Sequence, residues 1–256
     1  MSCPPLKGAP IHLHNLTITY QRHPAVHHVS GSFAAGSLTA VIGPNGAGKS
    51  TLIKAIAGTM SPSEGQIDRD GMPSSRYGYL PQAAEVDRSF PLSVFDTVAM
   101  GDWHRLGVFG GMKRRDVERA LDALDKVGLN GFEKRRISEL SSGQFQRVLF
   151  ARLLLQDAPV ILLDEPFNAI DERTTADLLQ LVAHWHDHGR TVIAVLHDMR
   201  QVRQYFPETL LMAREAVAWG PTQDVLRSDA LQRANMMTEY WQEDAHACAV
   251  HPGGPA

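Results

Sequence analysis

Residues 37–51 read "SLTAVIGPNGAGKST", and this stretch decides the fold. Its first half is a continuous apolar run rich in β-branched residues, which is typical of a strand buried on both faces of a parallel sheet. Its second half, residues 43–51, fits the pattern G-x-x-x-x-G-K-[ST] and precedes a predicted helix. Because free backbone N–H groups and the positive helix end then point at one place, the sequence predicts a phosphate-binding loop in an α/β protein.

The residues of this loop have separate expected roles. Gly43, Gly46 and Gly48 allow the backbone to wrap a phosphate chain. Lys49 is expected to reach the β and γ phosphates of a nucleotide, and the Ser50 hydroxyl is expected to ligate Mg²⁺. An ordinary glycine-rich turn is the alternative, and the strand–turn–helix context disfavours it. The residues expected to contact ATP here are Gly43, Pro44, Asn45, Gly46, Ala47, Gly48, Lys49, Ser50 and Thr51.

A second apolar strand ends in two carboxylates. Residues 160–166 read "VILLDEP", which places Asp164 at the carboxyl end of a buried strand, where α/β sheets hold their ligands. Asp164 is expected to hold Mg²⁺ directly or through water, and Glu165 to act as general base on the water that attacks the γ-phosphate. Two surface carboxylates at a strand end are the alternative, and the phosphate loop upstream favours the catalytic interpretation.

Strands and helical patterns alternate along the chain. Residues 37–43, 159–165 and 191–197 are strand-sized apolar runs that predict buried parallel strands. Helical patterns dominate between about residues 85 and 155, which separates the first of these strands from the other two. This order predicts one α/β core with a helical insertion rather than two independent domains.

Two amphipathic segments allow more detailed predictions of local structure. Residues 11–20 alternate apolar and polar side chains, but the phase changes near Asn15. That change predicts two short strands or a bulge in a half-exposed antiparallel sheet. Residues 114–128 predict a helix that ends at its last glycine. Its expected buried stripe is formed by Val117, Ala120, Leu121, Leu124 and Val127.

The composition limits the class of protein. With 256 residues, 43% hydrophobic and 21% charged, the chain is typical of a globular protein of one large or two small domains. A net charge of −3 argues against non-specific nucleic-acid binding. Two cysteines, Cys3 and Cys248, favour a reducing compartment over a disulfide framework. The N-terminus lacks a signal-peptide core and every apolar run is too short for a membrane span, so we expect a cytoplasmic protein.

An ordered set of five motifs resembles the nucleotide-binding subunit of an ATP-binding cassette (ABC) transporter. The resemblance covers about residues 10–225, and the ordered set is more specific than any single motif. It implies a P-loop NTPase core with a mixed, mostly parallel sheet, an N-terminal antiparallel β subdomain and a helical insertion. The motifs are "GPNGAGKST" (43–51), "LSSGQFQR" (140–147), "VILLDEP" (160–166), "NAID" (168–171) and "VLHD" (195–198). The implied single domain has a core of about 10–84 and 157–225, a helical subdomain of about 85–156, and C-terminal helices with a flexible tail of about 226–256.

Residues 140–144, "LSSGQ", resemble the family's signature motif. The resemblance implies that two copies pack head to tail, so that this turn contacts ATP held by the phosphate loop of the other copy. Ser141 can cap the following helix, and Gly143 permits close approach. Ser142 departs from the usual glycine and puts the tightness of the closed dimer in question. A plain helix cap is the alternative. The implied ATP contacts are Ser141, Ser142, Gly143 and Gln144.

The resemblance assigns four further roles. Gln82 matches the glutamine loop, which contacts Mg²⁺ or the attacking water, although a glutamine after proline is usually only a loop residue. His197 matches the switch histidine that contacts the γ-phosphate and orients Glu165. Asp171 matches the loop that links the two sites of the dimer and is one of the implied ATP-binding residues, and Tyr20 is the candidate to stack on adenine. The implied catalytic residues are Glu165, His197 and Gln82, and the implied Mg²⁺ ligands are Ser50, Gln82 and Asp164.

A cassette without a membrane span is the arrangement of importers, in which two such subunits drive separate permease chains. Residues 87–103, "DRSFPLSVFDTVAMGDW", are similar to importers of zinc or manganese, and somewhat similar to importers of metal chelates such as siderophores, haem or cobalamin. The expected partners are a second copy, permease subunits and, indirectly, an extracytoplasmic solute-binding protein, with no nucleic acid. The expected location is the inner face of the cell membrane. The alternatives are a soluble cassette ATPase acting on nucleic acid or the ribosome, and a P-loop kinase.

Twelve histidines raise the question of a regulatory metal site. No group has the four ordered ligands of a structural zinc site, so exposed polar residues are the favoured interpretation. The candidate groups are His23, His27 and His28; His184 and His188; and His246, Cys248 and His251 in the tail.

Overall fold

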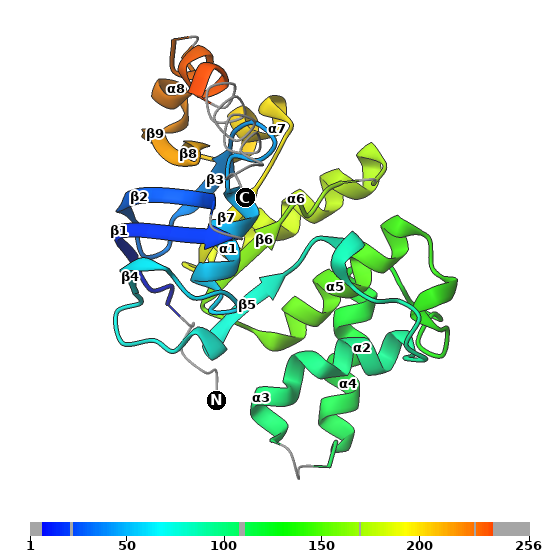
Figure 1. Ribbon diagram of the computed structural model, residues 1–256. Coiled ribbons are helices and arrows are strands. Elements are labelled where there is room, and N and C mark those ends of the chain that lie inside the picture. Colours follow the sequence, from blue (N-terminus) through cyan, green and yellow to red (C-terminus); the bar gives the residue numbers. More distant parts are fainter. Residues whose placement is uncertain (1–6, 21–22, 108–110, 169, 228, 238–256) are drawn as a thin grey trace, which may run out of the picture.

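A computed structural model describes residues 7–20, 23–107, 111–168, 170–227 and 229–237, without the side chains of Tyr20, His23 and Leu106. Its larger sheet has the order β5-β6-β7-β3-β8-β9 (Figure 1). All neighbouring strands are parallel except β8 and β9, so the predicted mixed, mostly parallel sheet is confirmed. The strands are β3 (Leu38–Ile42), β5 (Tyr77–Leu80), β6 (Val160–Asp164), β7 (Thr191–Val195), β8 (Glu208–Ala213) and β9 (Glu215–Pro221).

The three predicted apolar strands are β3, β6 and β7, and every residue in them is buried. They lie side by side at the centre of the sheet, in the order β6-β7-β3. Because they are parallel, their carboxyl ends meet at one edge. The phosphate loop directly follows β3, Asp164 is the last residue of β6, and His197 lies two residues after the end of β7. The sheet therefore brings motifs from three distant parts of the sequence to one place.

A second sheet is antiparallel and has the order β2-β1-β4, formed by β1 (Ile11–Tyr20), β2 (His23–Phe33) and β4 (Glu64–Asp68). The predicted irregularity in residues 11–20 is a bulge within one strand. The pairing register shifts between Leu13 and Leu16, and Asn15 adopts a left-handed φ of 49°. Because the bulge changes the phase of the strand, Ile11 and Leu13 before it and Leu16 after it are all buried.

The helices of the insertion lie together beside β5 and β6, away from the small sheet (Figure 1). They are α2 (Val94–Ala99), α3 (Trp103–Leu106), α4 (Arg114–Lys126) and α5 (Ser142–Gln156), with 3-10 turns at Met100–Asp102 and Ile137–Glu139. The remaining helices are α1 (Lys49–Ile56), α6 (Glu172–Asp187), α7 (Met199–Tyr205) and α8 (Thr222–Val225). Among the described residues, no helix has both the length and the apolar character that crossing a bilayer requires.

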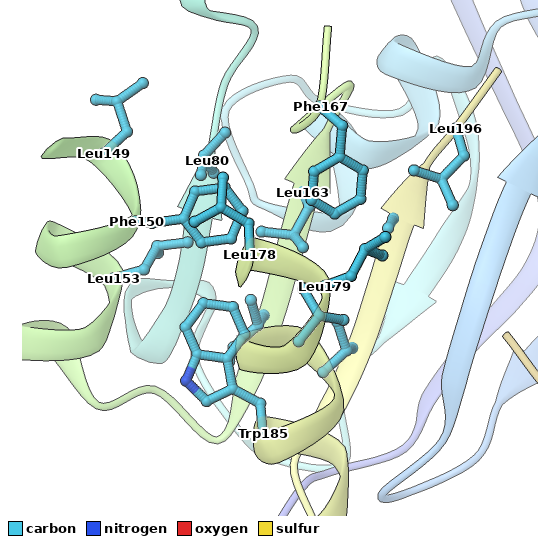
Figure 2. Close-up of a cluster of buried hydrophobic side chains, with 14 of the residues drawn as sticks. Leu80, Leu149, Phe150, Leu153, Leu163, Phe167, Leu178, Leu179, Trp185 and Leu196 are labelled. Carbon is cyan, nitrogen blue, oxygen red and sulfur yellow. The ribbon is translucent and has the colours of Figure 1, made fainter. Parts of the chain in front are cut away.

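Two hydrophobic clusters fill the molecule. One joins the small sheet and α1 to one face of the large sheet. The other joins α5, α6 and the insertion to its opposite face. Figure 2 shows Phe150 of α5 and Trp185 of α6 in this second cluster, with ring planes 1° apart and centroids separated by 6.0 Å. The long helix α5 is thus anchored by apolar packing along its length, which fixes the position of its N-terminal turn.

One part of the predicted stripe on α4 is wrong. Ala120 and Leu124 are buried and Val127 is 6% exposed, as expected, but Val117 is only half-buried and Leu121 is 38% exposed. Ala123 takes its place in the core. At 100° per residue, position 121 is rotated away from the line through 120, 124 and 127, so the stripe is narrower than the number of apolar residues suggests.

Candidate functional site

The loop between β3 and α1 owes its shape to close backbone contacts. A Cβ atom added to Gly43 would lie 2.0 Å from the carbonyl oxygen of Met212, and one added to Gly48 would lie 2.0 Å from that of Ala25. Both glycines also have positive φ angles, of 148° and 85°. No other residue fits these positions, so the two glycines are required by the loop itself and not only by a ligand.

Lys49 is the first residue of α1 and is 5% exposed. Its Nζ donates hydrogen bonds to the carbonyl oxygens of Gly43, at 2.9 Å, and Pro44, at 2.8 Å. Burial lowers the pKa of Lys49, and the nearby carboxylates of Glu165 and Asp164 oppose that shift. The loop therefore holds a desolvated amino group against its own backbone, and an anion is the partner that would stabilise its charge.

Ser50, Asp164 and Gln82 come together, as the resemblance implied. The Ser50 hydroxyl donates to Oδ1 of Asp164 at 2.8 Å, and Nε2 of Gln82 donates to Oγ of Ser50 at 3.2 Å. Asp164 is fully buried, and its Oδ2 atom has no hydrogen-bond partner among the described residues. Burial raises the pKa of Asp164, the Ser50 hydrogen bond opposes that shift, and the charge of Glu165 adds to it. An uncompensated buried carboxylate oxygen is suited to a cation.

Glu165 is held on both oxygens. Its Oε1 lies 2.7 Å from Nε2 of His197, and its Oε2 accepts a hydrogen bond from Nδ2 of Asn168. The backbone of Glu165 has a left-handed φ of 51°, a strained conformation that occurs most often at functional sites. Its side chain is only 18% exposed. The site therefore fixes the direction of this carboxylate with two neighbours and the backbone.

Asn168 is a site residue that the sequence pattern did not indicate. It lies in "NAID", in which only Asp171 was assigned a role. Its one local signal is its separation of three residues from Glu165, across a turn in which its N–H donates to the Glu165 carbonyl at 3.3 Å. A cavity of about 430 Å³ lies beside these groups, and its lining includes Gln82, Ser142, Glu165 and Asn168.

The signature turn starts α5, and the predicted cap is confirmed. Oγ of Ser141 accepts from the backbone N–H of Gln144 at 3.2 Å, and Oε1 of Gln144 accepts from the N–H of Ser141 at 3.0 Å. Gly143 has ordinary helical backbone, and a Cβ added there would find its nearest neighbour, Ile170, at 4.0 Å. Nothing in the described part of the subunit requires glycine at this position.

Asp171 is engaged within its own subunit. It is the N-cap of α6, where Oδ1 accepts from the N–H of Thr174 at 2.9 Å and Oδ2 accepts from its hydroxyl at 2.7 Å. These hydrogen bonds lower the pKa of Asp171. Nη2 of Arg147, on α5, donates to Oγ1 of Thr174 at 2.6 Å. The loop that carries Asp171 is thus tied to the helix that carries the signature turn.

Two groups of predicted residues lie outside this arrangement. The side chain of Tyr20 and all tail residues, including His246, Cys248 and His251, are outside the described part of the structure. The described residues contain no cluster of three or more histidine, cysteine or acidic side chains arranged to hold a metal.

Comparison with known proteins identifies the family. Residues 26–168 match the family model described as "ABC transporter". This chain belongs to the ABC transporter family. The cassette is 41% identical over 228 residues to the manganese transport system ATP-binding protein MntB of Bacillus subtilis (strain 168), covering 88% of this chain and 91% of that protein. It is 36% identical over 252 residues to the zinc transport system ATP-binding protein TroB of Treponema pallidum (strain Nichols), covering 94% and 95%.

Solved structures agree with the fold of the cassette. It superposes with a TM-score of 0.78 and 30% identity on an inward-facing putative metal-chelate type ABC transporter, covering 90% of each chain. It superposes with a TM-score of 0.73 and 27% identity on MJ0796, a bacterial ABC transporter cassette solved as a dimer, covering 83% of this chain and 98% of that one. The cassette is an ATPase of the ABC class, as the ordered motifs indicated.

Proposed function

We propose that the cassette powers the import of a metal ion, manganese or zinc, through a separate membrane permease at the inner face of the cell membrane. The near full-length identity of 36–41% to manganese and zinc transport subunits supports this cargo class. An extracytoplasmic solute-binding protein would deliver the ion to the permease. Import of a metal chelate is the second candidate, and the structural likeness to a putative metal-chelate transporter favours it.

Nucleotide binding follows from the groups at the carboxyl edge of the sheet. The phosphates of ATP would replace the two carbonyl oxygens as acceptors for Lys49, which returns a charged partner to a desolvated cation. Mg²⁺ would be held by Ser50, Gln82 and Asp164, whose Oδ2 is free to ligate it. When bound, Mg²⁺ neutralises charge on the β and γ phosphates. Tyr20 remains our candidate for stacking on adenine.

Glu165 is the general base in this proposal. Its carboxylate lies beside the cavity that Gln82 also lines, and His197 fixes one of its oxygens. A water held there would donate its proton to Glu165 as it attacks the γ-phosphate. The His197 side chain is 37% exposed, which leaves it accessible to a phosphate that approaches from solvent. Asn168 restrains the second carboxylate oxygen and so limits the directions in which Glu165 can accept a proton.

The proposed dimerisation depends on the signature turn. The observation that supports it is the open space beside Gly143. Within the described hydrogen bonds, none joins residues 141–144 to the phosphate loop of the same chain. Gly143 has no conformational need to be glycine, so the space beside it is suited to a ligand from outside the subunit. A head-to-tail dimer would place ATP from the partner against the N-terminus of α5. We also take residues 85–156 to be the subdomain that tilts when the dimer closes.

Replacing Asp164 by asparagine should stabilise the nucleotide-free protein at alkaline pH. The raised pKa of Asp164 means that its ionised form destabilises the fold, and this cost grows as the pH rises through its folded-state pKa. Asp164→Asn should therefore raise the melting temperature of the nucleotide-free protein at pH 8, by roughly 2–4 °C per kcal/mol gained. The difference should shrink toward pH 4. Calorimetry in EDTA measures this, and an unchanged or lower melting temperature would contradict the assigned charge state.

The exposed apolar residues of the insertion are the expected permease contact. Met100 is 42% exposed, and Trp103, three positions further along in the next helical turn, is 61% exposed. Trp103→Ser should weaken binding to the permease by at least about tenfold, because buried tryptophans dominate interfaces. ATP hydrolysis by the isolated cassette should not change. Met236→Ser, at another exposed apolar residue, is the control, and equal binding by both variants would remove Trp103 from the contact.

Uptake measurements test which metal ion or chelate is transported. The cassette would be purified with a candidate permease and reconstituted in vesicles with a candidate solute-binding protein. ATP should drive accumulation of ⁵⁴Mn or ⁶⁵Zn, and unlabelled haem or siderophore should not compete. Competition by a chelate would favour the second candidate. Co-purification with nucleic acid or ribosomes instead of a permease would overturn transport altogether.

A further inference from the structure

Arg88 contacts the chain at both ends of the signature turn. It lies on the segment between β5 and α2, six residues after Gln82. Nε and Nη2 of Arg88 donate to the carbonyl oxygen of Ile137, at 3.3 and 3.1 Å, and Nη2 also donates to that of Leu140. The guanidinium carbon lies 4.8 Å from the ring centroid of Phe145, in the first turn of α5. Its contacts thus bracket residues 141–144.

The other end of the same segment is fixed to the nucleotide site. Gln82 donates to Ser50 at 3.2 Å, and Glu85 forms an ion pair with Lys54 at 2.6 Å. Ser50 and Lys54 both belong to α1, the helix that starts at the phosphate loop. Residues 82–88, which we call the connecting segment, therefore run from the phosphate-loop helix to the signature turn within one subunit.

The chemistry of this contact requires arginine. Two backbone carbonyls and an aromatic face are engaged by one planar group, and only a guanidinium presents donors in a fork while stacking on a ring. A lysine at this position would keep the charge, but its single ammonium cannot reproduce that geometry. The carbonyl of Leu140 belongs to the peptide bond whose N–H, on Ser141, completes the cap of α5. A shift of Arg88 therefore moves the turn directly.

We propose that Arg88 is a positioning residue that transmits nucleotide binding from the subunit's own phosphate loop to the signature turn that it offers to the partner. ATP that draws Gln82 toward the phosphates displaces the connecting segment, and Arg88 carries that displacement to Leu140 and Phe145. Each site of the dimer is completed only when the opposite subunit has bound ATP. This inference rests on the proposed dimer, and it assigns the coupling between the two sites to one guanidinium.

The first test compares Arg88→Gln and Arg88→Lys with the wild type. Arg114→Gln, in the same helical region with a side chain 93% exposed, is the matched control. ATP affinity of the monomeric subunit should stay within twofold in all variants. The Hill coefficient of ATP hydrolysis should fall from near 2 to near 1 in both Arg88 variants, and the concentration of ATP needed for dimerisation should rise roughly tenfold. Unchanged cooperativity in both variants would overturn the role of Arg88.

A second measurement does not depend on the dimer or on the stability of the variants. At protein dilutions where the wild type is monomeric, ATP should alter hydrogen exchange at the amides of residues 142–145. If ATP leaves these amides unchanged, the transmission within one subunit does not exist, whatever the dimer does. If they respond but hydrolysis is independent of protein concentration and non-cooperative, the proposed dimer fails and the internal contact stands.

Discussion

Glu165→Gln should lower ATP turnover by about 10²–10⁴-fold and leave ATP binding intact. Glutamine preserves the shape of the side chain and can still meet the His197 and Asn168 side chains, but it cannot accept a proton from water. The phosphate loop, Lys49 and Ser50 are untouched by this change. The variant should therefore accumulate an ATP-bound dimer, because closure proceeds while the step that reopens the dimer does not.

Sedimentation with ATP measures the dimer, and phosphate release measures turnover. Gln201→Glu is a suitable control, because Gln201 lines the small cavity beside His197 and Glu165 without a hydrogen bond to either in the described structure. A Glu165→Gln protein that hydrolyses ATP within tenfold of the wild-type rate would show that another group removes the proton.

Gly143→Arg should abolish turnover without harming the isolated subunit. A Cβ added at Gly143 finds no atom closer than 4.0 Å, and arginine is a better helix former than glycine by about 1 kcal/mol. Monomer stability should stay equal or rise slightly, and ATP affinity of the monomer should be unchanged. Dimerisation should be lost, because the new side chain occupies the place that ATP from the partner would reach in the proposed dimer.

Gly111→Arg is the matched control. Gly111 also lies in the helical insertion, and a Cβ added there has no atom within 4 Å. The two variants add the same charge to the same region, so a loss of activity confined to Gly143→Arg would isolate the turn. Full activity in Gly143→Arg would mean that the turn serves only as a helix cap.

Much of the fold could be predicted because its determinants are local. The cap by Ser141, the apolar strands and the phase change at Asn15 each depend on residues within a few positions of one another. Burial depends on direction as well as polarity, which is why Leu121 was assigned to the core but is exposed. An apolar side chain at the edge of a stripe gives no local signal of which way it faces.

The site was predictable in its motifs but not in its supporting contacts. Lys49, Ser50 and Asp164 occupy motif positions with fixed spacing, so pattern alone locates them. Arg88 bonds to carbonyls 49 and 52 residues away, and carbonyls carry no sequence identity that could announce the contact. Asn168 was overlooked for a different reason, since its bond to Glu165 depends on the turn that follows β6.

Gly43 and Gly48, which lie against Met212 and Ala25, make the phosphate loop dependent on distant residues, one of which is synthesised much later. The sequence of this loop is complete by residue 51, but Met212, whose carbonyl oxygen lies against Gly43, comes some 160 residues later along the chain. Arg214 adds a backbone hydrogen bond to Ala47 from the same late segment, at 3.0 Å. A fragment that ends soon after residue 51 lacks this late segment, and we expect it to bind nucleotide more weakly than the full chain.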